Sequence, residues 1–244
     1  IIRTIPQIAE AIGASKKVIA LKGAYEKEIA ALKVAIREQN SDVEIFELGY
    51  FYPAGDEQTL IQQVTGRCVP ERGLPSDVGC VVDNVGTVLN IADALEGKAV
   101  TEKYLSVVGE VEHPIQLRVP IGTPVLECVK AAHPTVSDFA LIMGGPMMGK
   151  QLTEQAAMEQ AVVTKTTGNI LVLPKDHYLF RKASLPMETV RKQTKSACLQ
   201  CKMCTELCPR YLIGHQIHPN LMMRGLWLEP TITDNEEYLR MYGE

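Results

Sequence analysis

The sequence predicts a mixed α/β protein with three successive parts. Helix-like and strand-like segments alternate over residues 1–98, short strand-like segments surround one helix-like segment over residues 101–160, and a run of cysteines lies between helix-like segments within residues 161–244. Apolar residues at every third or fourth position favour a helix, whereas short alternating or continuous apolar runs favour a strand. The alternation of the two types indicates parallel strands that are covered by helices.

The first part is predicted to contain a parallel sheet. The expected helices cover residues 5–12, 25–39, 56–64 and 84–95, and the expected strands cover residues 17–23, 43–48 and 79–82. In sheets of this kind, ligands bind beyond the carboxyl ends of the strands. The segments that follow the second and third strands, residues 50–57 and 83–87, are therefore candidate binding segments.

These two segments carry glycine and polar residues, namely Gly55, Asp56, Glu57, Asp83, Asn84 and Thr87. Glycine lets the backbone approach a ligand closely, and Asn and Thr side chains both donate and accept hydrogen bonds. A structural interpretation accounts for several of them as well, because acidic residues favour the first turn of a helix and Asn favours the position before it. The residues by themselves leave both interpretations open.

The second part is predicted to combine short strands with one helix. The expected strands cover residues 104–109, 115–119 and 139–143, and the expected helix covers residues 125–132. A glycine-rich turn that follows, residues 144–149, contains Met147 and Met148. Because methionine fills irregular gaps in packed interiors, we expect this pair to pack in a core or a domain interface.

A helix-like segment, residues 187–197, leads into four cysteines that have the spacing of an iron-sulfur motif. Cys198, Cys201, Cys204 and Cys208 form the pattern C-x2-C-x2-C-x3-C, and Pro209 ends the run. This is the bacterial ferredoxin spacing for a [4Fe-4S] cluster, in which the fourth cysteine ligates another cluster when two are present. A structural zinc site fits less well, because zinc ligands generally come as two separated pairs. Disulfides and cysteines that merely pack are the remaining alternatives.

Two histidines follow the cysteine run, His215 and His218. No further ligand accompanies them outside the run, so the pattern does not favour a second metal site. We expect a solvated helix surface for them, or a hydrogen bond that tunes the cluster.

The overall composition is that of an ordinary soluble protein. The formal net charge of −4 disfavours nucleic acid as a partner, and no apolar run is long enough to span a bilayer. The chain has seven cysteines and no secretory signal, which indicates the cytoplasm, where thiols stay reduced. The composition leaves the oligomeric state open, including a homo-oligomer.

Several motifs occur in the order seen in a known family. They are Tyr52–Glu57, Gly73–Pro75, Asn84–Thr87, Gly144–Gly149, Thr164–Gly168 and the cysteine run. In this order they resemble the RnfC family of electron-transfer flavoproteins, and the resemblance covers nearly the whole chain. Within the family, Leu171–Lys175 and Cys208–His215 resemble the cobalamin-reductase branch of propanediol-utilisation microcompartments. The family is also similar to the NADH-binding flavin subunit of respiratory complex I.

The resemblance implies three domains. Residues 1–98 would form a Rossmann-like FMN-binding domain, residues 101–160 a β-grasp domain of the soluble-ligand-binding (SLBB) type, and residues 161–244 a linker with a helical ferredoxin-like [4Fe-4S] domain. It further implies a glycine-rich nucleotide loop before residue 1 and a second cysteine run after residue 244. The full-length protein would then hold two clusters, and Cys208 would ligate either this cluster or the second one.

The resemblance also implies the cofactor contacts and the reaction. FMN would lie against Gly55, Asp56, Glu57, Asp83, Asn84 and Thr87, and the four cysteines of the run would be metal ligands. Electrons would pass from NADH through FMN and the cluster to cobalamin, for the reactivation of a diol dehydratase, and no side chain would serve as a catalytic acid, base or nucleophile. The expected partners are cobalamin or a cobalamin-processing enzyme and a microcompartment shell or its enzymes. The expected location is the cytoplasm, inside or attached to a microcompartment.

Two alternatives remain beside this function. One is a generic RnfC-type electron-transfer subunit that uses a different acceptor. The other is a non-catalytic module that binds a ligand or partner protein and contains a structural metal site.

Overall fold

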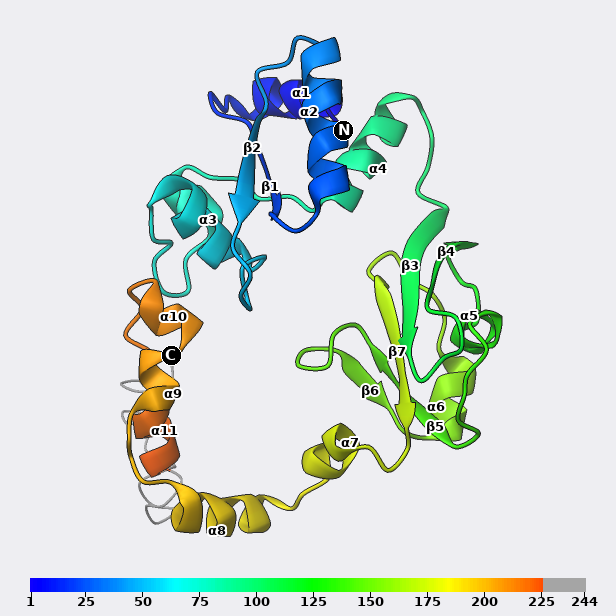
Figure 1. Ribbon diagram of the computed structural model, residues 1–244, viewed down its shortest axis with the longest axis vertical. Helices are drawn as coiled ribbons and strands as arrows, with labels where there is room; N and C mark the ends of the chain where they lie inside the picture. Colours follow the sequence, from blue (N-terminus) through cyan, green and yellow to red (C-terminus); the bar gives the residue numbers. More distant parts are fainter. Residues whose placement is uncertain (226–244) are drawn as a thin grey trace. The chain divides into compact units, whose positions relative to one another are not determined.

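The computed structural model describes residues 1–225, which fall into two compact units. One unit combines residues 1–95 with the described residues from Glu188 onward, and the other consists of Glu96–Met187. Residues 226–244, the end of the predicted iron-sulfur part, lie outside the described residues. The first unit therefore joins two segments that are far apart in the sequence (Figure 1).

The first segment of this unit alternates helices and strands as predicted. Its elements are α1 (Thr4–Ile12), β1 (Val18–Lys22), α2 (Glu26–Glu38), β2 (Glu44–Leu48), α3 (Glu57–Thr65), the 3-10 turn η1 (Pro75–Val78) and α4 (Val85–Leu95). Strands β1 and β2 pair in parallel, with Val18 opposite Glu44 and Lys22 opposite Leu48. Parallel neighbours need a crossover connection, which α2 provides.

The predicted strand at residues 79–82 is wrong. This segment is an extended coil between η1 and α4, and in the described chain the sheet contains β1 and β2 and no third strand. Gly79 has φ +68°, and the amide of Cys80 donates back to the carbonyl of Pro75, so the chain leaves η1 through a tight turn. Val81 is 60% exposed. A short apolar run forms a strand only where the edge of another strand is available to pair with it. The periodicity of the sequence does not reveal whether such an edge is present.

The second segment of this unit contains short helices around the cysteine run. They are α8 (Met187–Ala197), α9 (Met203–Glu206), α10 (Pro209–Leu212) and α11 (Pro219–Gly225). Helix α8 has the bounds that the sequence predicts. Helices α9, α10 and α11 are each seven residues or shorter, so tertiary contacts rather than intrinsic helix propensity hold them.

The other unit contains a five-stranded mixed sheet in the order β4-β3-β7-β5-β6. Its elements are β3 (Glu102–Gly109), β4 (Ile115–Pro120), α5 (Val125–Ala131), β5 (Phe139–Met143), β6 (Lys150–Leu152), α6 (Gln155–Gln160), β7 (Asn169–Pro174) and α7 (Tyr178–Ala183). Strands β3 and β7 are parallel, and the remaining neighbours are antiparallel. The central strand β7 lies beyond residue 160.

Both faces of this sheet are covered. On one face, Leu141 of β5 and Val172 of β7 pack with Val125 and Val129 of α5 and with Met158 of α6. On the opposite face, the alternate residues of the same strands pack against α7, as shown by the cluster of Ala140, Ile142 and Phe180. The predicted packing of Met147 and Met148 in a core is wrong, because these side chains are 72% and 88% exposed in the β5–β6 turn, and their packing in a domain interface stays a prediction.

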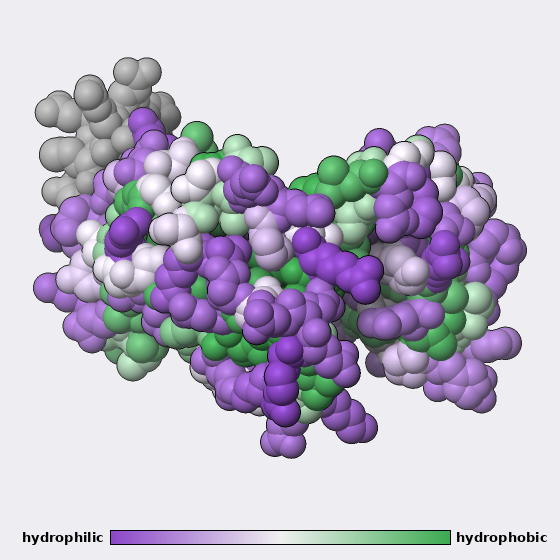
Figure 2. Space-filling model, turned by 90° about the horizontal axis from the view of Figure 1, so that it is seen from above, coloured by the Kyte–Doolittle hydropathy of each residue, from purple (hydrophilic) through white to green (hydrophobic). Residues whose placement is uncertain are grey.

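Hydrophilic side chains predominate on the face drawn in Figure 2, and hydrophobic ones form separate areas. Among residues 1–225, no helix combines the length and the apolar composition that crossing a membrane requires.

Candidate functional site

The four cysteines of the run lie at the ends and junctions of the short helices. Cys198 follows α8 and donates its backbone amide to the carbonyl of Thr194 at 3.0 Å. Cys201 lies in the loop, Cys204 lies within α9, and Cys208 precedes α10, whose first residue is Pro209. Proline suits this first helical position because its missing N–H would have no partner within the helix.

The loop between α8 and α9 bends through left-handed backbone conformations. Gln200 has φ +54° and Lys202 has φ +63°. Residues other than glycine adopt this region rarely and at an energetic cost, so surrounding contacts must hold them there.

A hydrogen-bonded network supplies those contacts. The amide nitrogen Nε2 of Gln200 lies 3.4 Å from Sγ of Cys198 and 3.1 Å from the carbonyl oxygen of Asn220. The hydroxyl of Thr205 donates to Oδ1 of Asn220 at 2.6 Å and accepts from the Asn220 amide at 3.1 Å. Thr205 and Asn220 are buried, so α9 and α11 are joined through polar groups that satisfy each other.

The donor set of the run fits an iron-sulfur cluster. All four thiols are free, with Cys201 and Cys204 exposed and Cys198 and Cys208 partly buried. Thiolates are the ligands that such clusters use, and the Gln200 amide already points a donor at one of the sulfurs. Within residues 1–225, no three His, Cys, Asp or Glu side chains are gathered closely enough to form a metal site. The fit therefore rests on residue type and spacing.

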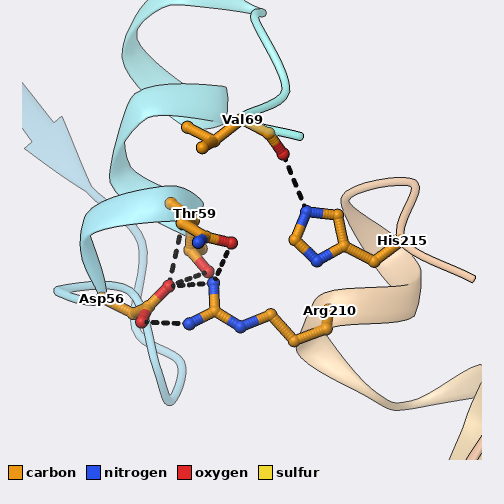
Figure 3. Close-up of polar contacts among 6 residues, drawn as sticks. Asp56, Thr59, Val69, Arg210 and His215 are labelled. Atoms are coloured by element: carbon orange, nitrogen blue, oxygen red, sulfur yellow. Dashed lines mark hydrogen bonds and ion pairs between the residues drawn. The ribbon is translucent and has the colours of Figure 1, made fainter. Parts of the chain in front are cut away.

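The cysteine-run segment is attached to the first part of the chain by a two-point ion pair. Both Nη atoms of Arg210 donate to the carboxylate of Asp56, at 2.9 Å and 2.8 Å, and Nη1 also donates to Gln58 at 2.7 Å (Figure 3). Asp56 is also the N-cap of α3, because it accepts hydrogen bonds from the amide and the hydroxyl of Thr59. The carboxylate is thus fully engaged within the protein.

Two further contacts lie beside this ion pair. His215 is buried, and its Nε2 lies 2.8 Å from the carbonyl oxygen of Val69 (Figure 3). A carbonyl can only accept, so Nε2 carries the hydrogen. The amide of Gln216 donates to the Glu71 carboxylate. His215 is therefore not a surface residue, and its Nε2 bonds a backbone carbonyl. His218 packs its ring against Tyr211 at 5.5 Å between centroids.

The predicted flavin residues other than Asp56 are all solvent-exposed: Gly55, Glu57, Asp83, Asn84 and Thr87. A Cβ atom added at Gly55 would meet no atom within 4 Å, so the internal packing does not require glycine there. Asn84 accepts from the amide of Gly86 through its side chain and from the amide of Thr87 through its carbonyl, so it starts α4 as a cap. The exposed groups fit contact with a bound cofactor, and this assignment stays a prediction.

Sequence reasoning missed Arg210 and Gln200. Arg210 follows directly after Cys208–Pro209, but nothing in the sequence connects it with a residue 154 positions earlier. Gln200 lies between Cys198 and Cys201 in the sequence. This position is the signal in the sequence that could have indicated a contact between its side chain and a sulfur.

Two of the glycine- and threonine-rich motifs meet in the other unit. Gly144, Lys150, Thr164 and Thr167 are among the residues that line a hollow of about 400 Å³ beside β5 and β6. The Asn169 side chain donates to the carbonyl of Gly144 at 3.0 Å and joins the two turns.

Models of known families match both ends of the chain. Residues 1–93 match the Nuo51 FMN-binding domain, and residues 197–241 match a 4Fe-4S dicluster domain. The second match contains all four cysteines of the run, and residues 226–241 of it lie outside the described residues.

Curated relatives match nearly the whole chain. The cobalamin reductase PduS of Citrobacter freundii is 43% identical over 228 residues, which cover 93% of this chain and 49% of the relative. The chain is similar to PduS over nearly all of its own length. A component of the Na(+)-translocating ferredoxin:NAD(+) oxidoreductase complex of Acetobacterium woodii is 32% identical over 89% of the chain and 46% of its own length. The chain therefore spans about half the length of these two relatives.

Solved structures share the fold. The NAD+-reducing [NiFe]-hydrogenase matches with TM-scores of 0.62 in its air-oxidized state and 0.61 in its H2-reduced state, at 20% sequence identity. The first match covers 98% of this chain and 50% of the hydrogenase chain. At this sequence identity the match supports the mixed α/β fold of the chain and not a reaction.

Proposed function

We propose that the full-length protein passes electrons from NADH through FMN and a [4Fe-4S] cluster to cobalamin, reducing cob(III)alamin or cob(II)alamin for diol dehydratase reactivation. The observation that carries the proposal is that one chain contains both an FMN-binding domain match and a 4Fe-4S dicluster domain match. The Arg210–Asp56 ion pair supports it, because it joins the two matched segments within one unit. The cobalamin acceptor is supported by the names of the PduS relatives.

The cysteines of the run would hold the cluster. Cys198, Cys201 and Cys204 would ligate it, and Cys208 would either complete it or ligate a second cluster. FMN would supply the conversion of a two-electron hydride donor into single electrons, and the cluster would carry those electrons onward.

The exposed groups of the first segment would contact FMN. Gly55, Glu57, Asp83, Asn84 and Thr87 are accessible. Asp56 would act indirectly, because its carboxylate is already bonded to Arg210 and Thr59. Its role would be to fix the turn that presents Gly55 and Glu57.

The proposal includes a domain division. The parallel β1–β2 pair with its crossover helix supports a Rossmann-like arrangement for residues 1–98. A β-grasp fold of the SLBB type, expected for residues 101–160, is supported by the β3–β4 hairpin and the crossing helix α5. We extend the proposed domain to β7, because that strand pairs in parallel with β3. Attachment to a microcompartment in the cytoplasm is part of the proposal and rests on the PduS relatives.

The test uses the full-length protein purified without oxygen. Iron, acid-labile sulfide and flavin are measured first, and NADH is then added while the absorbance is followed. We expect NADH to bleach the flavin and iron-sulfur absorbance, and cob(III)alamin to restore it. If NADH bleaches the flavin and cobalamin leaves it reduced, the acceptor is not cobalamin. A colourless protein that contains zinc contradicts the whole proposal.

Single variants assign the ligands. Cys201→Ser is expected to lower the iron content, because Cys201 is one of the run's thiols. Cys68→Ser is the matched control, since Cys68 is also an exposed free thiol but lies outside the run, and its iron content is expected to stay unchanged.

A ligand-binding role is the second candidate. The hollow of about 400 Å³ in the second unit favours it, because Lys150 and several threonines give it polar walls. Calorimetric titration of cobalamin and of NADH into the full-length protein and into its Lys150→Met variant tests this role. Binding that depends on Lys150 in a protein without electron transfer would favour it over the oxidoreductase.

A further inference from the structure

The side-chain amide of Gln200 lies between a cluster-run sulfur and a backbone carbonyl. Its Nε2 is 3.4 Å from Sγ of Cys198 and 3.1 Å from the carbonyl oxygen of Asn220. Because a carbonyl only accepts hydrogen bonds, the nitrogen and not the oxygen of the amide must face Asn220. The same NH₂ group has a second hydrogen, which is available to the sulfur.

The position of this amide is fixed from both sides. The Gln200 backbone is left-handed, with φ +54°, and its side chain is partly buried. Its other partner, Asn220, is buried and makes two hydrogen bonds with buried Thr205. A strained backbone and a buried anchor together hold the donor at the sulfur, which a freely rotating surface glutamine would not achieve.

We infer that Gln200 is a positioning residue that donates a hydrogen bond to the Cys198 thiolate and thereby raises the reduction potential of the cluster. The inference rests on the proposed function, in which Cys198 is a cluster ligand. A donor to a ligand sulfur withdraws charge from the cluster, so it favours the state that has gained one electron. The step is a one-electron reduction without a bond change, and Gln200 keeps its proton throughout.

A structural role for Gln200 makes a different prediction. If the amide only tied the loop to α11, its loss would lower cluster content or stability in the same way as loss of the Thr205–Asn220 contact. A role at the sulfur changes the potential of a cluster that is still fully assembled.

The experiment uses the full-length protein, purified and assayed without oxygen. Iron and sulfide are counted, and the midpoint potential is measured by a redox titration followed by electron paramagnetic resonance. Gln200→Met keeps the length of the side chain and removes the donor. We expect full iron content, a more negative midpoint potential, and a roughly tenfold lower ratio of reduced to oxidised cluster at the wild-type midpoint.

Two further variants separate the explanations. Gln200→Glu has nearly the same shape, replaces the donor by a carboxylate oxygen, and is expected to shift the midpoint in the same direction. Thr205→Val removes the hydroxyl that bonds Asn220 but leaves Gln200 and Cys198 in place. It is expected to lower thermal stability and to shift the midpoint less than either Gln200 variant does, because Gln200 keeps its donor.

Each outcome decides the question. An unchanged midpoint in Gln200→Met or Gln200→Glu with full iron content overturns the inference. Loss of iron from both Gln200 variants assigns a structural role and overturns it too. Absence of iron from the wild-type protein is seen before any variant is made and overturns the proposed function itself, so the two failures are distinguishable.

Discussion

Arg210 and Asp56 form a two-point ion pair although they are 154 positions apart in the sequence. Arg210 directly follows the last cysteine of the run and its proline, and Asp56 caps the helix after the second strand. The pair thus fixes the predicted cluster segment against a predicted flavin segment. The side chains are 33% and 25% exposed, so solvent screens this pair less than it screens a surface pair.

Removal of Arg210 is expected to destabilise the first unit. Arg210→Met should lower the free energy of unfolding by about 1 to 2 kcal/mol, because a charge-assisted two-point contact is lost. Asp56→Ala should cost about 1 kcal/mol more, since the α3 cap is lost as well. Urea unfolding followed by circular dichroism measures both changes.

The double variant tests whether the two residues act together. Its loss of stability should be smaller than the sum of the single losses, because each single change already breaks the same pair. Lys192→Met is the control, since the Lys192–Glu188 pair is 76% and 65% exposed and should contribute about 0.5 kcal/mol or less. Additive losses for Arg210 and Asp56 would contradict a direct coupling.

His215 is expected to stabilise the fold through its hydrogen bond with Val69. His215→Phe should lower the free energy of unfolding by about 1 to 3 kcal/mol, because the change leaves a buried carbonyl without its donor. His215→Gln places an amide nitrogen near the former position of Nε2 and should cost less. Hydrogen exchange around residues 66–78 should report the same order. A larger loss in His215→Gln than in His215→Phe would show that ring packing matters more than the hydrogen bond.

Gly109 is expected to tolerate no side chain. Its φ is +104°, and an added Cβ would lie 2.1 Å from the carbonyl oxygen of Val172 in the neighbouring strand. Gly109→Ala should therefore cost about 3 kcal/mol or more, because β3 and β7 must separate locally. Thermal unfolding of the variant measures the loss.

Gly168→Ala is the matched control for Gly109. A Cβ at this position meets no atom within 4 Å, and its φ lies outside the left-handed range. Its stability should change by about 0.5 kcal/mol or less. Similar losses at the two glycines would contradict the assigned contact with Val172.

The buried thiol of Cys128 should resist alkylation at neutral pH. Burial raises the pKa of this thiol above its ordinary value, so the reactive thiolate forms only at a higher pH than in the unfolded chain. The stability that this shift contributes is present below the ordinary pKa and is lost as the pH rises through the raised value. Timed labelling with iodoacetamide and mass spectrometry across neutral to alkaline pH follows the reaction.

Cys68 provides the comparison, because it is an exposed free thiol in the same chain. It should be labelled first and at lower pH. Labelling of Cys128 as fast as Cys68 in the folded protein would show that the second unit opens readily.

The helices and strands of the first unit were predictable where the apolar periodicity extends over many residues or where a capping residue marks the start of a helix. Helix α8 has the expected bounds. Asp56 caps α3, which is a common role for an acidic residue at the start of a helix. The segment 79–82 was not predictable, because its apolar residues are compatible with a strand but no neighbouring edge pairs with it in the described chain. Residue type alone was also insufficient for Met147. Methionine favours burial, but the turn that contains Met147 keeps its side chain exposed.

The candidate site divides in the same way. The spacing of Cys198, Cys201 and Cys204 predicts a set of sulfur ligands without any structure, because cluster chemistry imposes that spacing on the chain, and this assignment stays a prediction. The flavin residues came from the resemblance, and they stay a prediction.

The sequence by itself determined most of the succession of helices and strands and the four thiols of the run, because both are encoded by residues close together in the chain. The tertiary structure decided that Arg210 neutralises Asp56, that His215 is buried against Val69, and that Gln200 reaches Cys198 through an anchor at Asn220. The long-range contacts depend on how separate segments pack, and even the short step from Gln200 to Cys198 depends on a left-handed backbone. Neither hydrophobic periodicity nor motif spacing carries that information.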